Sequence, residues 1–400
     1  MKRRKLLALV CIMSLTAALF TGCGKKGNNA EDNKGNQTEN TDGKQAETEN
    51  KGTETGKGLK IAIVTSPSGV DDGSFNQDNY NGILNFIKNN PDATVKTVKE
   101  PTGDPTAAVQ AVADIVAGYD IIITPGFQFA GISTIAGDNP GSKFILIDSN
   151  PQEIDGVTEF DNIYAMTFAE EESGFFAGMA AALETNTGKV AVVNGVAYPS
   201  NVNYQYGFES GVNYVNAKYD KKVEFVELPA YAGTDVTGAN VGGNYVGTFA
   251  DEPTGKVVGN ALINEGVDIM FVAAGGSGNG VFTAAKEAKG VKVIGCDVDQ
   301  FDDGKNGSEN VILTSVLKVM SLNVERALND VKDGTFKGQN VLLKADTDST
   351  GFVSAKGRQQ LSEDSIAKMS EAYKLLQAGE IVPAANFNGI SSDSFPGLPE

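Results

Sequence analysis

The 400-residue sequence contains no histidine and no tryptophan, and only three cysteines. The absence of histidine excludes Ser-His-Asp hydrolysis, Cys-His proteolysis and zinc sites built on imidazole. Neither a G-x-S-x-G motif nor a P-loop occurs. The acidic stretch 297–309 resembles a calcium loop, but Phe301 occupies a position that needs an oxygen ligand. We therefore predict no catalytic residue, no cofactor and no metal site, although catalysis by paired carboxylates stays open.

The N-terminus has the features of a lipoprotein export signal. A basic start and a short apolar run lead to small residues before Cys23, and "LFTGC" is similar to a lipobox with Phe20 where leucine is usual. We predict a signal peptide at 1–22 and a lipid on Cys23. This lipid would anchor the protein to the cell membrane, facing outward: the extracellular side in a Gram-positive cell, the periplasm otherwise. The alternative is an ordinary exported protein with an incidental cysteine. Cys11 would leave with the signal, so Cys296 would have no disulfide partner in the same chain.

The segment after this cysteine is polar. Residues 24–58 contain no aromatic residue, and alanine is their only apolar type. Such a composition cannot bury a core, so residues 23–58 are predicted to be a lipidated cysteine followed by a disordered tether. The whole chain has 33 basic and 51 acidic residues, a formal net charge of -18. This charge argues against a nucleic acid as a partner.

From about residue 59 onward, short apolar runs alternate with segments of helical periodicity. The apolar runs are rich in isoleucine and valine without polar alternation, which is typical of parallel strands covered by helices on both faces. Two such sets follow one another, so we predict an α/β fold with two doubly wound lobes and a ligand cleft between them. The N-terminal lobe should comprise residues 59–168 and about 311–335, and the C-terminal lobe residues 169–310 and about 336–390. A Gly-rich segment at 234–243 should be a surface insertion, with a lid over the cleft as the alternative.

Aromatic, acidic, amide, glycine and lysine residues follow the predicted strands. Ligands of parallel α/β sheets bind beyond the carboxyl ends of the strands. An aromatic face there can stack on a flat heterocycle, while carboxylates accept hydrogen bonds from sugar hydroxyls and a lysine donates them. The sequence therefore predicts a site for a flat ring attached to a polyol. The candidate residues are Asp72, Phe75, Asn76, Phe127, Asp148, Gly275, Gly276, Gly278, Asp297 and Lys318.

Each of these residues also has a structural interpretation. Asp72 is suited to cap the helix that follows it, and Phe75 to pack on that helix as a hydrophobic staple. Phe127 is of a type more often found in a core. The glycines of "GGSGNG", residues 275–280, fit a tight strand-to-helix turn as well as a ligand contact. Lys318 can be a solvated charge, although it follows an apolar strand.

Four motifs in order carry a family resemblance: "DDGSFNQ", "AAGGSGNGVFTAAKE", "IGCDVDQ" and "LTSVLK". Behind a lipobox, they resemble the basic membrane protein family of lipoproteins, which includes purine nucleoside receptors of bacterial ABC importers. The resemblance covers nearly all of residues 59–377. It implies a type I periplasmic-binding-protein fold with a nucleoside held between the lobes.

The resemblance also implies roles for individual residues. It implies that Phe75 stacks on the base and that Asn76 and Asp148 contact the base edge. Asp297 and Lys318 would hold the ribose, and the glycines near residue 275 would approach the ligand closely. Phe75 and Asp297 should therefore lie in different lobes. A second stacking aromatic is not assigned; the candidates are Phe127, Tyr206 and Phe282.

The predicted function is that of a lipid-anchored receptor, not an enzyme. It would capture nucleosides, purine nucleosides in particular, close around them by hinge motion, and deliver them to an ABC permease and its ATPase. Three alternatives stay open: a receptor for another small polyol such as a sugar, a carboxylate-dependent nucleoside hydrolase, and a surface adhesin with a vestigial cleft.

Overall fold

The computed structural model describes residues 58–399. The predicted signal peptide, the lipid site at Cys23 and nearly all of the tether lie outside the described residues. Within residues 58–399, no helix is both long enough and apolar enough to cross a bilayer. The described chain folds into two α/β lobes, each built on a six-stranded sheet. This architecture confirms the predicted fold class.

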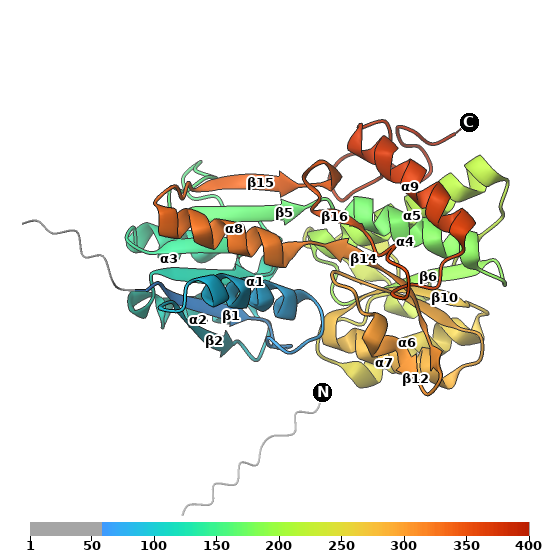
Figure 1. The fold of residues 1–400 in the computed structure, drawn as a ribbon, viewed down its shortest axis with the longest axis horizontal. Helices are drawn as coiled ribbons and strands as arrows, with labels where there is room; N and C mark the ends of the chain where they lie inside the picture. Colours follow the sequence, from blue (N-terminus) through green and yellow to red (C-terminus); the bar gives the residue numbers. More distant parts are fainter. Residues whose placement is uncertain (1–57, 400) are drawn as a thin grey trace, which may run out of the picture. The chain divides into compact units, whose positions relative to one another are not determined.

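The sheet of the N-terminal lobe is parallel throughout, in the order β15-β5-β4-β3-β1-β2. Neighbouring residues of strand β1 face opposite sides: Ile61 and Ile63 pack against helices α1 and α8, and Ala62 and Val64 against α2 and α3. Burial on both faces explains why these strands read as unbroken apolar runs. Figure 1 shows α8 beside α1, although the two helices are far apart in the chain. The elements are β1 (Lys60–Thr65), α1 (Phe75–Asn89), β2 (Thr94–Lys99), α2 (Pro105–Ala113), β3 (Ile121–Pro125), α3 (Ile132–Asp138), β4 (Lys143–Ile147), β5 (Ile163–Phe168), α8 (Met320–Asp333) and β15 (Gln339–Leu343).

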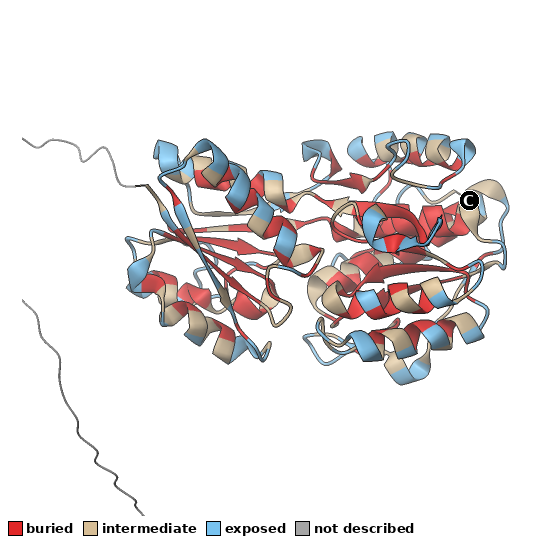
Figure 2. Ribbon diagram, turned by 60° about the horizontal axis from the view of Figure 1, so that its bottom comes forward, coloured by how far each residue is buried: buried red, intermediate tan, exposed pale blue. Residues whose placement is uncertain are grey.

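The sheet of the C-terminal lobe has the order β16-β14-β11-β10-β6-β7, with β16 antiparallel to β14. On one face, α4, α5 and α9 cover Val190 and Val192 of β6; on the other, α6 and α7 cover Ala191 and Val193. Figure 2 shows the buried strands between partly exposed helices. The elements are α4 (Glu170–Glu184), β6 (Lys189–Asn194), α5 (Pro199–Tyr219), β7 (Glu224–Phe225), α6 (Glu252–Asn264), β10 (Ile269–Ala273), α7 (Gly278–Glu287), β11 (Lys292–Gly295), β14 (Ile312–Lys318), β16 (Thr350–Phe352) and α9 (Glu363–Gln377).

The chain passes between the lobes three times: from β5 to α4, from β14 to α8, and after β15. The lobe boundaries differ from the predicted segments in two places. Strand β14, predicted in the N-terminal lobe as part of 311–335, pairs with β11 of the C-terminal lobe. Strand β15, predicted in the C-terminal lobe as part of 336–390, pairs with β5 of the N-terminal lobe. Strand partners are chosen by long-range pairing, which the local pattern does not reveal.

The Gly-rich segment 234–243 lies largely in a short hairpin of β8 (Gly233–Thr234) and β9 (Asn240–Gly242). The hairpin is fixed to α5, because the Gln205 side-chain amide donates to the Val241 carbonyl at 2.8 Å. None of residues 234–243 lines the cavity between the lobes described below. The segment is therefore an insertion packed on the C-terminal lobe and not a wall of the cleft.

Candidate ligand-binding site

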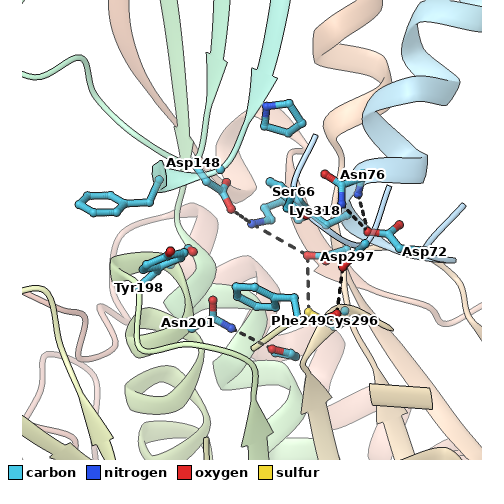
Figure 3. A pocket seen from close by; sticks show the side chains of 18 of the residues that line it. Ser66, Asp72, Asn76, Asp148, Tyr198, Asn201, Phe249, Cys296, Asp297 and Lys318 are labelled. Atoms are coloured by element: carbon cyan, nitrogen blue, oxygen red, sulfur yellow. Dashed lines mark hydrogen bonds and ion pairs between the residues drawn. The ribbon is translucent and has the colours of Figure 1, made fainter. Parts of the chain in front are cut away.

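A cavity lies between the lobes at the carboxyl ends of the strands, as expected for this fold. The empty space in it, which includes open solvent at its mouth, is about 590 Å³. Figure 3 shows side chains from both lobes converging on it. Eight of the ten predicted residues line it: Asp72, Phe75, Asn76, Phe127, Asp148, Gly275, Asp297 and Lys318.

Two predicted glycines do not line the cavity. At Gly278, the first residue of α7, a Cβ atom would lie 2.9 Å from Val272 Cγ1 of β10. At Gly276, a Cβ atom would lie 3.1 Å from the Phe249 carbonyl oxygen. Both glycines thus allow close approach of protein to protein, as the tight-turn interpretation of "GGSGNG" implied. Gly275, with φ of 51°, does line the cavity.

Asp72 lines the cavity and also closes the start of α1. Its carboxylate accepts hydrogen bonds from the backbone N–H groups of Ser74, Asn76 and Gln77 at 3.0–3.1 Å. It also accepts from Asn76 Nδ2 at 2.8 Å. Burial raises the pKa of Asp72, while these donors oppose the rise. Four donors on one carboxylate leave it little capacity for a ligand, so its effect on a ligand passes through Asn76.

Asn76 presents a hydrogen-bond acceptor to the cavity. Its Nδ2 donates to Asp72 and, at 3.0 Å, to Ser66 Oγ, which fixes the orientation of the amide. Within residues 58–399, its buried Oδ1 receives no hydrogen bond. A buried acceptor without a donor costs free energy, so this atom favours a ligand that supplies an N–H or O–H group.

Lys318, at the end of β14, is 2 % exposed and lies among three carboxylates. Its Nζ donates to Asp148 and to Glu170 Oε1 at 3.3 Å, and lies 4.0 Å from Asp297 Oδ1. Burial alone would lower the Lys318 pKa, but the three carboxylates raise it above its ordinary value. The side chain is therefore charged, and its Nζ lies 4.9 Å from the centre of the Phe75 ring.

Asp148 and Asp297 occupy equivalent places in the two lobes. Asp148 directly follows β4, and Asp297 follows β11 with one residue between; both have left-handed backbones, with φ of 60° and 69°. Such strained conformations in non-glycine residues gather at functional sites. Asp297 accepts hydrogen bonds from the Tyr204 and Ser74 hydroxyls, each at 2.9 Å.

Asp148 has one free carboxylate oxygen. Its Oδ2 faces Lys318, whereas its Oδ1 is buried and receives no hydrogen bond from the described part of the chain. Burial raises the pKa of Asp148, and Lys318 opposes the rise. Asp148 Oδ1 and Asn76 Oδ1 are thus two acceptors of the N-terminal lobe to which a ligand could donate hydrogen bonds.

Aromatic rings line the cavity from both lobes. Phe75 begins α1, and Phe127 belongs to the N-terminal lobe. The Phe127 ring lies 5.4 Å from that of Tyr198, and Tyr198 lies 6.1 Å from Phe249, measured between ring centroids. Phe249 and Tyr198 precede helices of the C-terminal lobe, so they complete an aromatic wall.

Only one of the three candidates for the second stacking aromatic lines the cavity. Tyr206 packs with Val202 and Tyr245 away from the cavity, and Phe282 is buried in the core behind β10. Phe127, the third candidate, lines the cavity. Phe249 is not among the residues predicted from the sequence. An available signal was its position two residues before Asp251, which caps α6 by accepting the Thr254 N–H at 3.0 Å.

Comparison with known proteins identifies the family. The Bmp family model, described as ABC transporter substrate-binding protein PnrA-like, matches residues 59–228 and 235–383. The chain belongs to this family. The predicted membership in the basic membrane protein family is confirmed. The protein is accordingly a substrate-binding component of an ABC transporter and not an enzyme.

Relatives of this Bmp protein support the assignment. It is 31 % identical over 305 residues to the ABC transporter nucleoside-binding protein BmpA of Lactococcus lactis, covering 71 % of this chain and 78 % of the relative. It is 29 % identical to the CD4+ T-cell-stimulating antigen of Listeria monocytogenes, covering 82 % and 88 %. Its fold is similar to that of a solute-binding protein from Aeropyrum pernix, with a TM-score of 0.69, 22 % identity, and coverage of 83 % and 94 %.

Proposed function

We propose that this Bmp protein captures nucleosides, purine nucleosides in particular, and delivers them to an ABC import permease. The observation that carries the proposal is one cavity that combines the Phe75 ring, two unpartnered acceptors and a buried lysine among carboxylates. The relative from Lactococcus lactis named as a nucleoside-binding protein supports it.

In the proposed complex, the base stacks on Phe75 and faces the ring of Phe249 from the other lobe. Asn76 Oδ1 and Asp148 Oδ1 accept hydrogen bonds from N–H groups on the base edge. Lys318 and Asp297 hold the hydroxyls of the pentose. A ligand that leaves any of these buried groups unpaired binds less tightly, which makes the site selective for a base joined to a sugar.

Titration calorimetry with adenosine, guanosine, inosine, uridine and ribose tests the proposal. We expect binding of purine nucleosides, weaker binding of uridine because its ring offers less stacking area, and no binding of ribose alone. Binding of ribose or another sugar without any nucleoside would instead assign the protein to receptors for other polyols. A native mass measurement of the freshly purified protein shows whether a ligand of nucleoside mass is carried along.

We also propose that the protein is tethered outside the cytoplasm by a lipid on Cys23, with a signal peptide at 1–22. The basic start and the "LFTGC" sequence support this location. Replacing Cys23 by serine should move the protein from the membrane fraction to the medium or periplasm. Cys11→Ser is the matched control and should leave it in the membrane fraction. Retention of Cys23→Ser in the membrane would contradict the anchor.

A further inference from the structure

Glu170 is a buried carboxylate for which the proposed contacts with the ligand give no role. It is the first residue of α4, directly after the chain crosses from the N-terminal to the C-terminal lobe, and is 2 % exposed. Its Oε1 lies 3.3 Å from Lys318 Nζ, and its Oε2 accepts a hydrogen bond from Asn203 Nδ2 at 2.9 Å. The carboxylate thus holds one side of the lysine that faces the cavity.

The charges around Lys318 do not balance. One ammonium faces the carboxylates of Asp148, Glu170 and Asp297, so full ionisation would give the cluster one positive and three negative charges, a net charge of -2. Uncompensated buried charge is costly, and binding a proton is the simplest way to reduce it. Asp297 already accepts hydrogen bonds from the Tyr204 and Ser74 hydroxyls, and Asp148 makes the closest contact with Lys318. Glu170 is therefore the member best placed to take the proton.

The lobes divide this cluster. Asp148 belongs to the N-terminal lobe, whereas Glu170 and Lys318 lie where the chain enters and leaves the C-terminal lobe. In the hinge motion that the proposed function requires, opening would separate Asp148 from Glu170 and Lys318 and admit water, and closing would reverse both changes. Asp148 and Glu170 both contact Lys318, so a proton on Glu170 reduces the negative charge that Asp148 faces when the lobes are closed.

We propose that Glu170 is a positioning residue for Lys318 and that its carboxylate takes up one proton from solvent when the lobes close on a ligand. This inference rests on the proposed function, which supplies the ligand and the hinge motion between an open and a closed form. The reaction is a simple protonation, in which the carboxylate becomes a carboxylic acid and no other bond changes.

The acid strength of Glu170 agrees with this proposal. Burial raises its pKa from an ordinary 4.5 to about 7; Lys318 opposes the rise and Asp148 adds to it. If the open form has a pKa nearer 4.5, closure takes up protons between these two values. A raised pKa in the closed form means that affinity is highest at low pH, falls as pH rises toward 7, and is level above it. The groups that face Glu170 and Lys318 are Asp148, Asp297, Tyr204, Cys296 and Glu171.

Titration calorimetry of the full protein with inosine, at about pH 5.5 and about pH 8, tests the proposal. With a pKa near 4.5 in the open form and about 7 in the closed form, we expect affinity to be about 30-fold lower at the higher pH. Near pH 6.5, the measured heat should depend on the ionisation enthalpy of the buffer, with the sign of proton uptake. Glu170→Gln should make the affinity independent of pH and abolish the proton uptake.

Glu171→Gln is the matched control. Glu171 is the next residue of α4, and burial and Glu170 raise its pKa to about 8, but it makes no ion pair with Lys318 within residues 58–399. This variant should keep the pH dependence of the unaltered protein. A pH-independent affinity of the unaltered protein, a dependence retained by Glu170→Gln, or a dependence lost in Glu171→Gln would overturn the proposal.

A ligand-free measurement separates this inference from the proposed function. Since closure takes up a proton, the radius of gyration from X-ray scattering should decrease as pH falls from about 8 to about 5.5, and Glu170→Gln should lose this change. If inosine does not bind but this change is seen, the nucleoside assignment fails and the role of Glu170 stands. If inosine does not bind and the radius is independent of pH, both fail.

Discussion

Phe75 provides the most direct single-residue test of the proposed stacking. Its ring is half-buried and faces the cavity beside the Lys318 ammonium. Stacking of a base on an aromatic ring is worth about 1–3 kcal/mol, so we expect Phe75→Ala to weaken nucleoside binding by about 5-fold to 150-fold. Calorimetry measures the change. Phe387→Ala, which removes a 66 % exposed ring outside the cavity, is the control and should bind normally. Equal affinity of the Phe75 and Phe387 variants would refute stacking on Phe75.

Lys318 should matter for stability as well as for binding. Replacing it by methionine leaves three carboxylates facing one another without a countercharge. Removing one partner of a buried ion pair costs about 3–5 kcal/mol, and we expect a loss of that size in urea unfolding at about pH 8.

The loss from Lys318→Met should shrink near pH 5. Burial already raises the pKa values of Asp148 and Glu170 above their ordinary ones, and without the lysine these carboxyls protonate more readily still. A raised pKa in the folded state destabilises it at high pH, and the penalty is relieved as pH falls through that pKa. Lys256→Met removes an exposed pair with Glu287 and should cost about 0–1 kcal/mol at either pH. A loss for Lys318→Met that is the same at both pH values would contradict this account.

The sequence revealed residues that lie at the carboxyl ends of strands or in the loops that follow them. Asp148 and Lys318 could be located in this way because the carboxyl ends of parallel strands meet at one edge of each sheet. Glu170 follows β5 with one residue between, as Asp297 follows β11, so the same rule could have found it, whereas Phe249 lies in the loop before α6, where that rule does not apply. Gly278, in contrast, was predicted to contact the ligand but does not line the cavity. A glycine in a strand-to-helix turn can be needed for close packing alone, whether or not a ligand is near.

At the scale of elements, the start of α1 links stability to binding. Asp72 accepts from three backbone N–H groups there and orients the amide of Asn76. Losing a cap of this kind costs about 1–2 kcal/mol, so Asp72→Ala should lower the free energy of unfolding by that amount and also weaken nucleoside binding. Unfolding in urea and calorimetry measure the two effects.

Asp104 provides the matched comparison for Asp72. It caps α2 by accepting the Ala107 N–H at 3.0 Å and does not line the cavity. Asp104→Ala should therefore cost similar stability while leaving affinity unchanged. If both variants bind alike, Asp72 acts as a helix cap alone and has no part in orienting Asn76 for the ligand.

The elements themselves were predictable where the local signal is strong. The run "KFILI" in β4 is apolar throughout, and Asp104 followed by Pro105 marks the start of α2. Strands β15 and β16 give little local signal, because "QNVLL" and "TGF" are short and none of the β15 residues is fully buried. An edge strand is fixed by its partner, here β5 or β14, and such long-range pairing leaves no local periodicity to detect.

At the scale of the whole described chain, the sequence indicated two lobes but not how the chain is shared between them. Two successive α/β sets were visible, yet the last third of the chain contributes to both sheets. Strand β14 ends at Lys318, and α8 begins two residues later in the other lobe. The crossing therefore places the lysine of the cluster where the chain passes between the lobes, so the proposed closure would act directly on the charge at the site.

Closure should be measurable through a bond that exists only when the lobes meet. Ser68 Oγ of the N-terminal lobe donates to the Phe249 carbonyl of the C-terminal lobe at 2.9 Å. Because this bond is absent from an open form, it stabilises only the closed one, and a net hydrogen bond is worth about 0.5–1.5 kcal/mol. We expect Ser68→Ala to weaken nucleoside binding by about 2-fold to 12-fold, with no matching loss in the stability of either lobe.

X-ray scattering provides the structural side of the same test. The radius of gyration should fall when nucleoside is added, and Ser68→Ala should need more ligand to reach the same value, since less of the binding energy is available to close the lobes. Ser370→Ala, which removes a hydroxyl bonded to the Ile366 carbonyl within α9, is the control and should follow the unaltered protein. If the radius does not change with ligand while binding is observed, the lobes are closed beforehand, and the cost of opening them cannot set the affinity.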